Sequence, residues 1–144
     1  MKFLGHAHRS LDDKGRLILP PSFRDQILSA VPDGRIILTL GESHVIGISP
    51  DQWAELEKKI EGLTAPTRAQ RNRIRVLYSG YEEVSVAKNG RVSIPQHLRK
   101  SGRLDGEVVL AGVGKRFEIW DKAEFEGLLA QTEADEDDDF GLPF

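Results

Sequence analysis

A ten-residue pattern occurs twice in this chain, and it limits the fold more than any other feature of the sequence. Residues 11–20 read LDDKGRLILP, and residues 86–95 read VAKNGRVSIP. In each copy a short turn ends in glycine and is followed by an arginine, a strand-like stretch and a proline; the two arginines, Arg16 and Arg91, are 75 positions apart. A repeat of this length predicts two related supersecondary units, each too small to bury a core alone.

The similarity between the two copies extends beyond these ten residues in both directions. Gly5 aligns with Gly80 at the same offset, whereas further on the offset falls to 72, so that Trp53 aligns with Phe125. Matches on both sides of a three-residue deletion indicate duplication. Each copy predicts the order β-β-α-β-β-α with short strands. We therefore expect an α+β, mainly β fold in which the units interleave into one small pseudo-twofold barrel, because closure protects strand edges.

Apolar periodicity and turn residues give the expected elements of both units. In the first unit we expect strands at 3–12, 16–19, 35–40 and 44–48, and helices at 21–30 and 49–62. In the second we expect strands near 80–87, 91–94, 107–111 and 116–120, and helices at 96–101 and after Asp121. A helix at 66–78 links them, opened by a possible capping box at Thr67 and Gln70. The expected domain limits are 1–63 and 78–131 for the units, 64–77 for the linker helix and 132–144 for an acidic, disordered tail.

Composition sets the class of protein but not its function. The chain has 144 residues and no cysteine, so a single cytoplasmic domain without disulfides is the expectation. No apolar run is long enough to span a membrane, and the N-terminus lacks the apolar stretch of a signal peptide. The net charge of −3 includes six acids between Glu133 and Asp139, so residues 1–132 carry +3. A mildly basic body fits nucleic-acid binding, and it also fits many enzymes.

The two glycine-arginine loops are the strongest candidates for a binding site. Glycine supplies the positive φ that a tight hairpin turn requires, and Asn89-Gly90 predicts a type I′ turn. A tight turn fixes the neighbouring Arg16 or Arg91, whose planar guanidinium suits phosphate or the guanine edge. One such loop alone is more simply explained as an ordinary hairpin with solvated charges. Two equivalent copies favour a nucleic-acid interface.

Other polar residues indicate a function less clearly than the two loops do. Arg24 and Arg99 follow the proline of each copy, and they either bind phosphate or pair with acids at a subunit contact. Three arginines of the linker helix form a stripe that fits a solvated face or salt bridges between subunits: Arg68, Arg71 and Arg75. His6 and His8 share a strand face but are too few for a zinc site. We expect no metal, no cofactor and no catalytic residue.

The first loop carries a family resemblance. Asp12-x-x-x-Arg16 within residues 11–20 resembles the signature of the MraZ proteins, in the AbrB/MazE-like superfamily with its SpoVT-AbrB domains, and the resemblance covers residues 1 to about 130. It implies a swapped-hairpin β-barrel and a ring-shaped homo-oligomer. It also implies a bacterial transcriptional regulator, usually a repressor of its own operon, that binds short double-stranded DNA repeats upstream of the division and cell-wall gene cluster.

The resemblance also implies which residues contact DNA. The family's loop maps onto Asp12, Lys14 and Arg16. The second copy departs from the signature because Ala87 stands where the first has Asp12. Asn89-Gly90 compensates by favouring the turn directly. The DNA-contact residues expected outside the first loop are therefore Lys88, Asn89, Arg91, Arg24 and Arg99.

Two functions of different classes remain at this point. The first is a DNA-binding regulator, cytoplasmic and nucleoid-associated, with no membrane or small-molecule partner. The alternative is an antitoxin-like protein-binding module that uses the acidic tail. A third possibility, a small enzyme, is not supported by any residues of the sequence. We expect the tail to oppose DNA binding by covering the Lys14–Arg16 loop. The competing view is that Phe140 and Phe144 dock on a neighbouring subunit.

Overall fold

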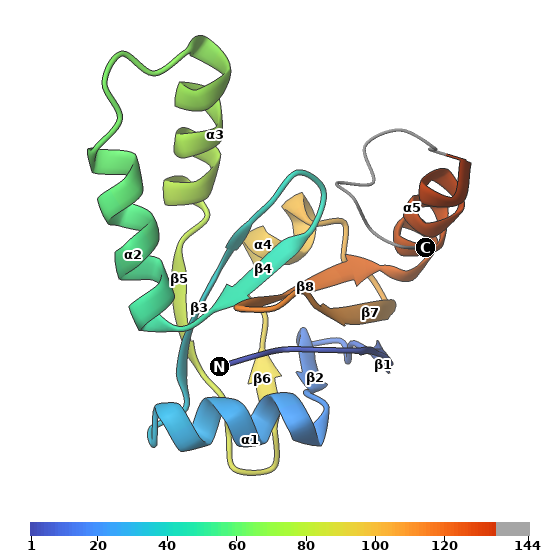
Figure 1. The fold of residues 1–144 in the computed structure, drawn as a ribbon. Helices are drawn as coiled ribbons and strands as arrows, with labels where there is room; N and C mark the ends of the chain where they lie inside the picture. The colour runs from blue at the N-terminus through green and yellow to red at the C-terminus, as the bar shows by residue number, and fades with distance from the viewer. Residues whose placement is uncertain (135–144) are drawn as a thin grey trace.

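The computed structural model describes residues 1–134 and contains each expected helix and strand (Figure 1). The first half runs β1 (His6–Ser10), β2 (Arg16–Ile18), α1 (Pro21–Ala30), β3 (Arg35–Leu40), β4 (Val45–Ile48) and α2 (Pro50–Glu61). The second half runs α3 (Arg68–Ser79), β5 (Glu82–Ser85), β6 (Arg91–Ser93), α4 (Gln96–Ser101), β7 (Glu107–Gly112), β8 (Arg116–Asp121) and α5 (Lys122–Ala134). Apart from α3, the two halves have the same order of elements.

The helices begin at the residues that the sequence signals indicated. At the start of α2, the Ser49 side chain accepts a hydrogen bond from the backbone N–H of Gln52, at 3.2 Å. At the start of α3, Thr67 and Gln70 form the full capping box, with bonds of 3.1 and 2.8 Å in the two directions. These caps satisfy N–H groups that have no partner within the helix. The capping box expected at Thr67 and Gln70 is confirmed, whereas Ser49 forms one of the two bonds of such a box.

The strands of the two halves are interleaved. A six-stranded antiparallel sheet has the order β1-β7-β8-β4-β3-β5, and β2 and β6 pair as a separate two-stranded ribbon. The second hairpin of each half forms as expected, since β3 pairs with β4 and β7 with β8. The two arms of the first hairpin of each half instead pair with the other half of the chain. β1 pairs with β7 and β2 with β6, while β5 pairs with β3. The expectation that residues 3–12 and 16–19 pair with each other is wrong, because each arm finds its hydrogen bonds and its apolar partners across the duplication.

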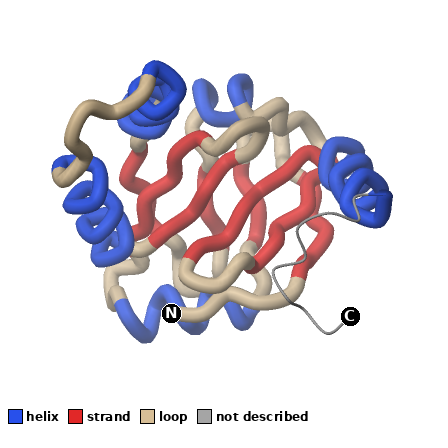
Figure 2. Tube along the Cα trace, turned by 45° about the horizontal axis from the view of Figure 1, so that its top comes forward, coloured by secondary structure: helices blue, strands red, loops and turns tan. Residues whose placement is uncertain are grey.

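The strands do not close into a barrel. Within residues 1–134, the six-stranded sheet is open, with β1 and β5 at its edges, and the β2–β6 ribbon makes no ladder with either edge. The chain leaves the β1 ladder at Ser10 and turns at Asp12 before β2 begins, so the two ladders stay separate. The α+β class is confirmed. Figure 2 shows the strands at the centre with helices around them.

The main core lies between the inner face of the sheet, the ribbon, α1 and α4. Phe3, Phe23 and Phe117 meet in it with ring centroids 5.2–5.5 Å apart. Leu17 of β2 and Val92 of β6 are buried in the same cluster, so the inner side of the ribbon is anchored in the core. A second, smaller cluster on the outer face of the sheet packs under α2 and consists of Ile37, Ile48 and Trp53.

The last helix runs further than expected. α5 continues to Ala134, and the Asp121 carboxylate accepts a hydrogen bond from the Glu124 N–H near its start, at 3.1 Å. The rest of the acidic tail, residues 135–144, lies outside the described residues. None of the helices in the described part is long and apolar enough to cross a membrane.

Candidate nucleic-acid interface

The β2–β6 ribbon brings the two repeated arginines to one face. In its register Arg16 lies opposite Ser93, and Ile18 lies opposite Arg91. Residues directly opposite each other in an antiparallel pair share a face, and alternate residues share it too. Leu17 and Val92 face the core, with 3% and 2% of their surface exposed, so the other four residues face outward. The two arginines are two residues apart along the ribbon, or about 7 Å.

Asp12 holds the first loop in place. Its Oδ1 accepts hydrogen bonds from the N–H groups of Lys14 and Arg16, at 3.0 and 2.8 Å, and its Oδ2 accepts from Arg16 Nε at 2.7 Å. The bonds from the backbone and then the side chain of Arg16 lower the pKa of the Asp12 carboxyl. A carboxylate with these partners orients the guanidinium rather than contacting a phosphate itself. Asp12 therefore positions Arg16.

The second loop keeps the backbone of the first without its carboxylate. Ala87 N–H donates to the Arg91 carbonyl at 2.9 Å, and Gly90 N–H donates to the Ala87 carbonyl at 2.8 Å. The Asn89 side chain accepts from the Arg91 N–H at 3.0 Å, replacing one of the three bonds that Asp12 makes. The Arg91 guanidinium has no ion pair with another residue in the described range. Asp12 thus orients the Arg16 guanidinium, whereas no acidic partner within the described residues orients that of Arg91.

The loop conformation differs from the expected turn type. Gly15 and Gly90 have φ of +79° and +90°, as expected for glycine in a tight turn. Asn89 has a negative φ, so the type I′ assignment is wrong. Three residues separate the paired ends Ala87 and Arg91, and a three-residue loop takes a tight turn followed by one glycine in the left-handed region.

Each loop is held by the other half of the chain. The Gly15 carbonyl accepts a hydrogen bond from the Ile94 N–H at 2.9 Å, and the Gly90 carbonyl accepts from the Leu19 N–H at 2.9 Å. Arg99 lies across the first loop, where a Cβ added at Gly15 would be 2.3 Å from its Nε. Because the strands interleave, each loop is hydrogen-bonded to the other half of the chain.

Arg24 and Arg99 occupy equivalent places beside these loops. Arg99 Nε donates to the Ile94 carbonyl at 2.9 Å. Arg24 Nε pairs with its neighbour Asp25 at 3.0 Å, and its Cδ lies 3.5 Å from a Cβ added at Gly90. Both arginines therefore lie beside the loop of the opposite half.

Arg9 is a residue of this site that the sequence did not suggest. Its Nε donates to the Ile18 carbonyl at 2.8 Å, at the end of the ribbon, and its Nη1 donates to the His8 carbonyl at 2.8 Å. Its equivalent in the second copy, 75 positions on, is Val84. The repeat pointed only to residues present in both copies and so missed it.

The arginine stripe of the linker helix is not part of this site. In Figure 1, α3 stands with α2 as a helical hairpin above the sheet, whereas β2 and β6 lie near α1. Arg71 donates to the Pro66 carbonyl and Arg75 donates to Asn72, both at 2.7 Å, within the helix or next to it. The structure brings together the loop arginines and leaves this stripe elsewhere.

Comparison with known proteins identifies the family of the chain. A protein-family model described as "MraZ protein, putative antitoxin-like" matches residues 3–74 and 77–140, and so covers both halves of the duplication. The chain belongs to the MraZ family. The match over both halves agrees with the resemblance seen in the Asp-x-x-x-Arg signature of the first loop.

Named relatives are similar to this chain along most or all of their length. A protein of Maridesulfovibrio salexigens is 54% identical, with 100% of each chain covered. A protein of Solidesulfovibrio magneticus is 45% identical over 92% of this chain and 88% of its own, and one of Pediococcus pentosaceus is 36% identical over 97% and 99%. Each is named "Transcriptional regulator MraZ". The MraZ family is thus one of transcriptional regulators, which is a non-enzymatic role.

Proposed function

We propose that this MraZ protein is a sequence-specific DNA-binding regulator that places its β2–β6 ribbon in the major groove. The observation that supports this most directly is the shared outward face of Arg16 and Arg91 on a two-stranded antiparallel ribbon. The major groove is wide enough to admit such a ribbon, and an arginine fork matches guanine O6 and N7. The core anchors the ribbon from its inner side through Leu17 and Val92.

The residues around the ribbon divide into contacts and supports. Arg16 and Arg91 are the proposed base or phosphate contacts, and Lys14 and Lys88 are the proposed phosphate contacts in the loops that precede them. Asp12 and Asn89 position these arginines through the hydrogen bonds described above. Arg24 and Arg99 lie beside the loops, and Arg9 bonds to the end of the ribbon.

Assembly is the second part of the proposal. One protomer offers few phosphate contacts and a body charge of only +3 over residues 1–132, so it binds DNA weakly alone. A ring-shaped homo-oligomer presents the same ribbon to successive operator repeats, and linked contacts raise the affinity. By the family resemblance, those repeats lie upstream of the division and cell-wall gene cluster, and binding there represses the protein's own operon at the nucleoid.

The proposal is tested by DNA binding to the chain's own upstream region. Arg16→Ala is expected to lose about 1–3 kcal/mol of binding free energy and to relax the sequence preference. Arg68→Ala is the matched control, because it removes the same charge from α3, outside the ribbon. Equal affinity of wild type and a folded, assembled Arg16→Ala variant would exclude the ribbon as the interface.

The role of assembly has its own test in the number of operator repeats. Upstream DNA with a single repeat is expected to bind much more weakly than a proportional loss of binding sites would predict, because the linked contacts are lost. Equal affinity for one repeat and several would mean that protomers bind independently.

A further inference from the structure

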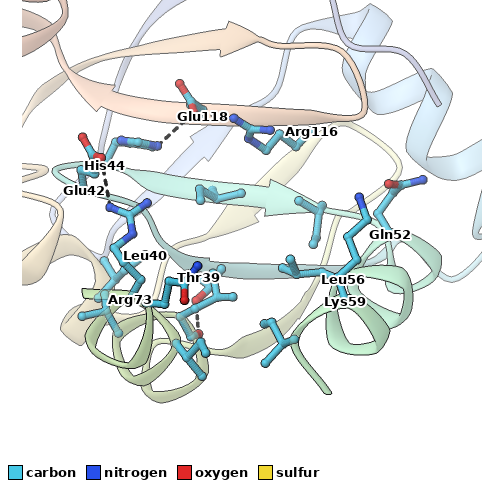
Figure 3. A pocket seen from close by; sticks show the side chains of 18 of the residues that line it. Thr39, Leu40, Glu42, His44, Gln52, Leu56, Lys59, Arg73, Arg116 and Glu118 are labelled. Carbon is cyan, nitrogen blue, oxygen red and sulfur yellow. Dashed lines mark hydrogen bonds and ion pairs between the residues drawn. The ribbon is translucent and has the colours of Figure 1, made fainter. Parts of the chain in front are cut away.

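A groove on the outer face of the sheet has no role in the proposed DNA interface. It has a volume of about 850 Å³ and lies along β4, between the α2–α3 hairpin and β8 (Figure 3). Its apolar lining includes Ile46, Leu56 and Ile74. The ribbon belongs to the inner cluster, whereas Ile46 and Leu56 pack on the outer one, so the groove and the ribbon are on opposite faces of the sheet.

Basic side chains surround this apolar floor. Lys59 comes from α2, Arg73 from α3 and Arg116 from the start of β8 (Figure 3). Lys115, directly before β8, also lines the groove. Arg73 belongs to a helix that carries four arginines and no acidic residue. Two of the three acids of the groove pair with groove bases: Glu42 with Arg73 at 3.1 Å, and Glu118 with His44 and Arg116 at 3.0 and 3.6 Å. Among the described residues, Lys59 and Lys115 are the groove bases without an ion pair. An acidic ligand with apolar side chains fits these surroundings.

We infer that the occupant of this groove is the C-terminal segment of the same chain, residues 135–144. Its sequence is DEDDDFGLPF, five acids followed by two phenylalanines and a leucine. The acids match the unpaired lysines of the rim, Lys59 and Lys115, and Phe140 and Phe144 match the apolar floor. No other stretch of the chain combines an acidic run of this length with neighbouring aromatic residues.

The segment is long enough to reach the groove from its own helix. α5 starts next to the groove, since Phe125 contacts Trp120 with ring centroids 6.1 Å apart, and Trp120 stacks on the groove residue His44 at 4.4 Å. α5 has 13 residues and is therefore about 20 Å long. Ten extended residues span about 33 Å. The segment can thus return over the full length of α5 and place its last residues in the groove.

Docking here separates the acidic segment from the DNA loops. A segment held on the outer face does not cover the Lys14–Arg16 loop, which is the position expected for it from charge alone. This inference is independent of the proposed DNA binding, because it concerns only the contact between the segment and the groove.

Engineered disulfides in the full-length chain test the inference, since the chain contains no cysteine. Lys59→Cys, which lines the groove, is combined with Gly141→Cys, between the two phenylalanines. The matched control is Lys58→Cys with Gly141→Cys, since residue 58 is exposed on the same helix but does not line the groove. A third pair, Lys14→Cys with Gly141→Cys, reports contact with the DNA loop.

The rate of disulfide closure is followed on non-reducing gels under mild oxidation. The disulfide of the Lys59→Cys, Gly141→Cys variant is expected to close within one chain at least about tenfold faster than that of the residue-58 control, because docking raises the effective concentration. Adding Phe140→Ser and Phe144→Ser is expected to remove this advantage. Equal rates for the two α2 positions would overturn the inference, and so would faster closure at residue 14. A disulfide-linked dimer would overturn it as well, because the occupant would then be the segment of a second copy.

Discussion

Substitution of Gly15 by alanine tests whether the two halves of the chain support each other's loops. Gly15 has φ of +79°, and an added Cβ would lie 2.3 Å from Arg99 Nε. Gly5 has the same φ of +79° but nothing within 4 Å of an added Cβ. The pair Gly15→Ala and Gly5→Ala therefore separates the cost of the backbone conformation from the cost of displacing Arg99.

The size of both effects follows from the geometry. A residue with a side chain in the left-handed region costs about 1–2 kcal/mol, which is the whole effect expected for Gly5→Ala. At Gly15, Arg99 must move as well, and its hydrogen bond to the Ile94 carbonyl is lost. A bond from a charged donor contributes about 1.5–3 kcal/mol, so Gly15→Ala is expected to cost about 2.5–5 kcal/mol in total.

The measurement is equilibrium unfolding in urea at one fixed protein concentration. A double-mutant cycle then isolates the contact, because Arg99→Ala removes the group with which the new methyl collides. In that background Gly15→Ala is expected to cost no more than Gly5→Ala. If Gly15→Ala costs the same with and without Arg99, the arginine does not support the loop and the reasoning is refuted.

Three further predictions concern the same ribbon. Gly90→Ala is expected to destabilise less than Gly15→Ala in the same urea experiment, because its added Cβ comes no closer than 3.2 Å to another atom. The wild type is expected to be more stable than the Asp12→Asn variant by an amount that is constant above about pH 5. This difference in stability is expected to shrink as the pH falls through the lowered pKa of Asp12, because protonation of the carboxylate removes the stability that a depressed folded pKa gives. Unfolding at pH 3–7 checks this, and a difference that grows on acidification would contradict it. Leu17→Ala is expected to cost about 2–5 kcal/mol by thermal or urea unfolding, whereas Ile18→Ala, on the outward face, is expected to cost little.

Local sequence signals predicted the elements well because their causes are local. Thr67 and Gln70 satisfy the first N–H groups of α3, and this requires only residues three positions apart. The positive φ of Gly15 and Gly90 likewise follows from the length of each loop and the residue within it. The repeat itself predicted that the halves interleave, because neither half could bury its apolar face alone.

The partner of each strand and the support of each loop depend on contacts distant in sequence, and no local pattern contains them. β1 pairs with β7 and β2 with β6 because of the way the two halves pack together. The hairpin expected at 3–12 and 16–19 was therefore wrong. Arg99 reaches the Gly15 loop only because that pairing carries it there. The groove along β4 could not be found from sequence either, since it is lined by residues from both halves.

Fusion of the two copies in one chain explains how the loops could come to differ. Each loop is held by the opposite half, so the backbone of the second loop stays in place without a carboxylate at Ala87. In a symmetric pair of separate chains, a change at one loop would occur at both. Here Arg16 is oriented by Asp12, whereas Arg91 has only its backbone N–H held, by Asn89. We therefore expect Arg16 to give sequence preference, since base recognition requires a fixed fork, and Arg91 to contribute mainly charge. Accordingly, Arg91→Lys is expected to leave DNA affinity nearly unchanged, whereas Arg16→Lys is expected to weaken it and to relax the preference for the operator.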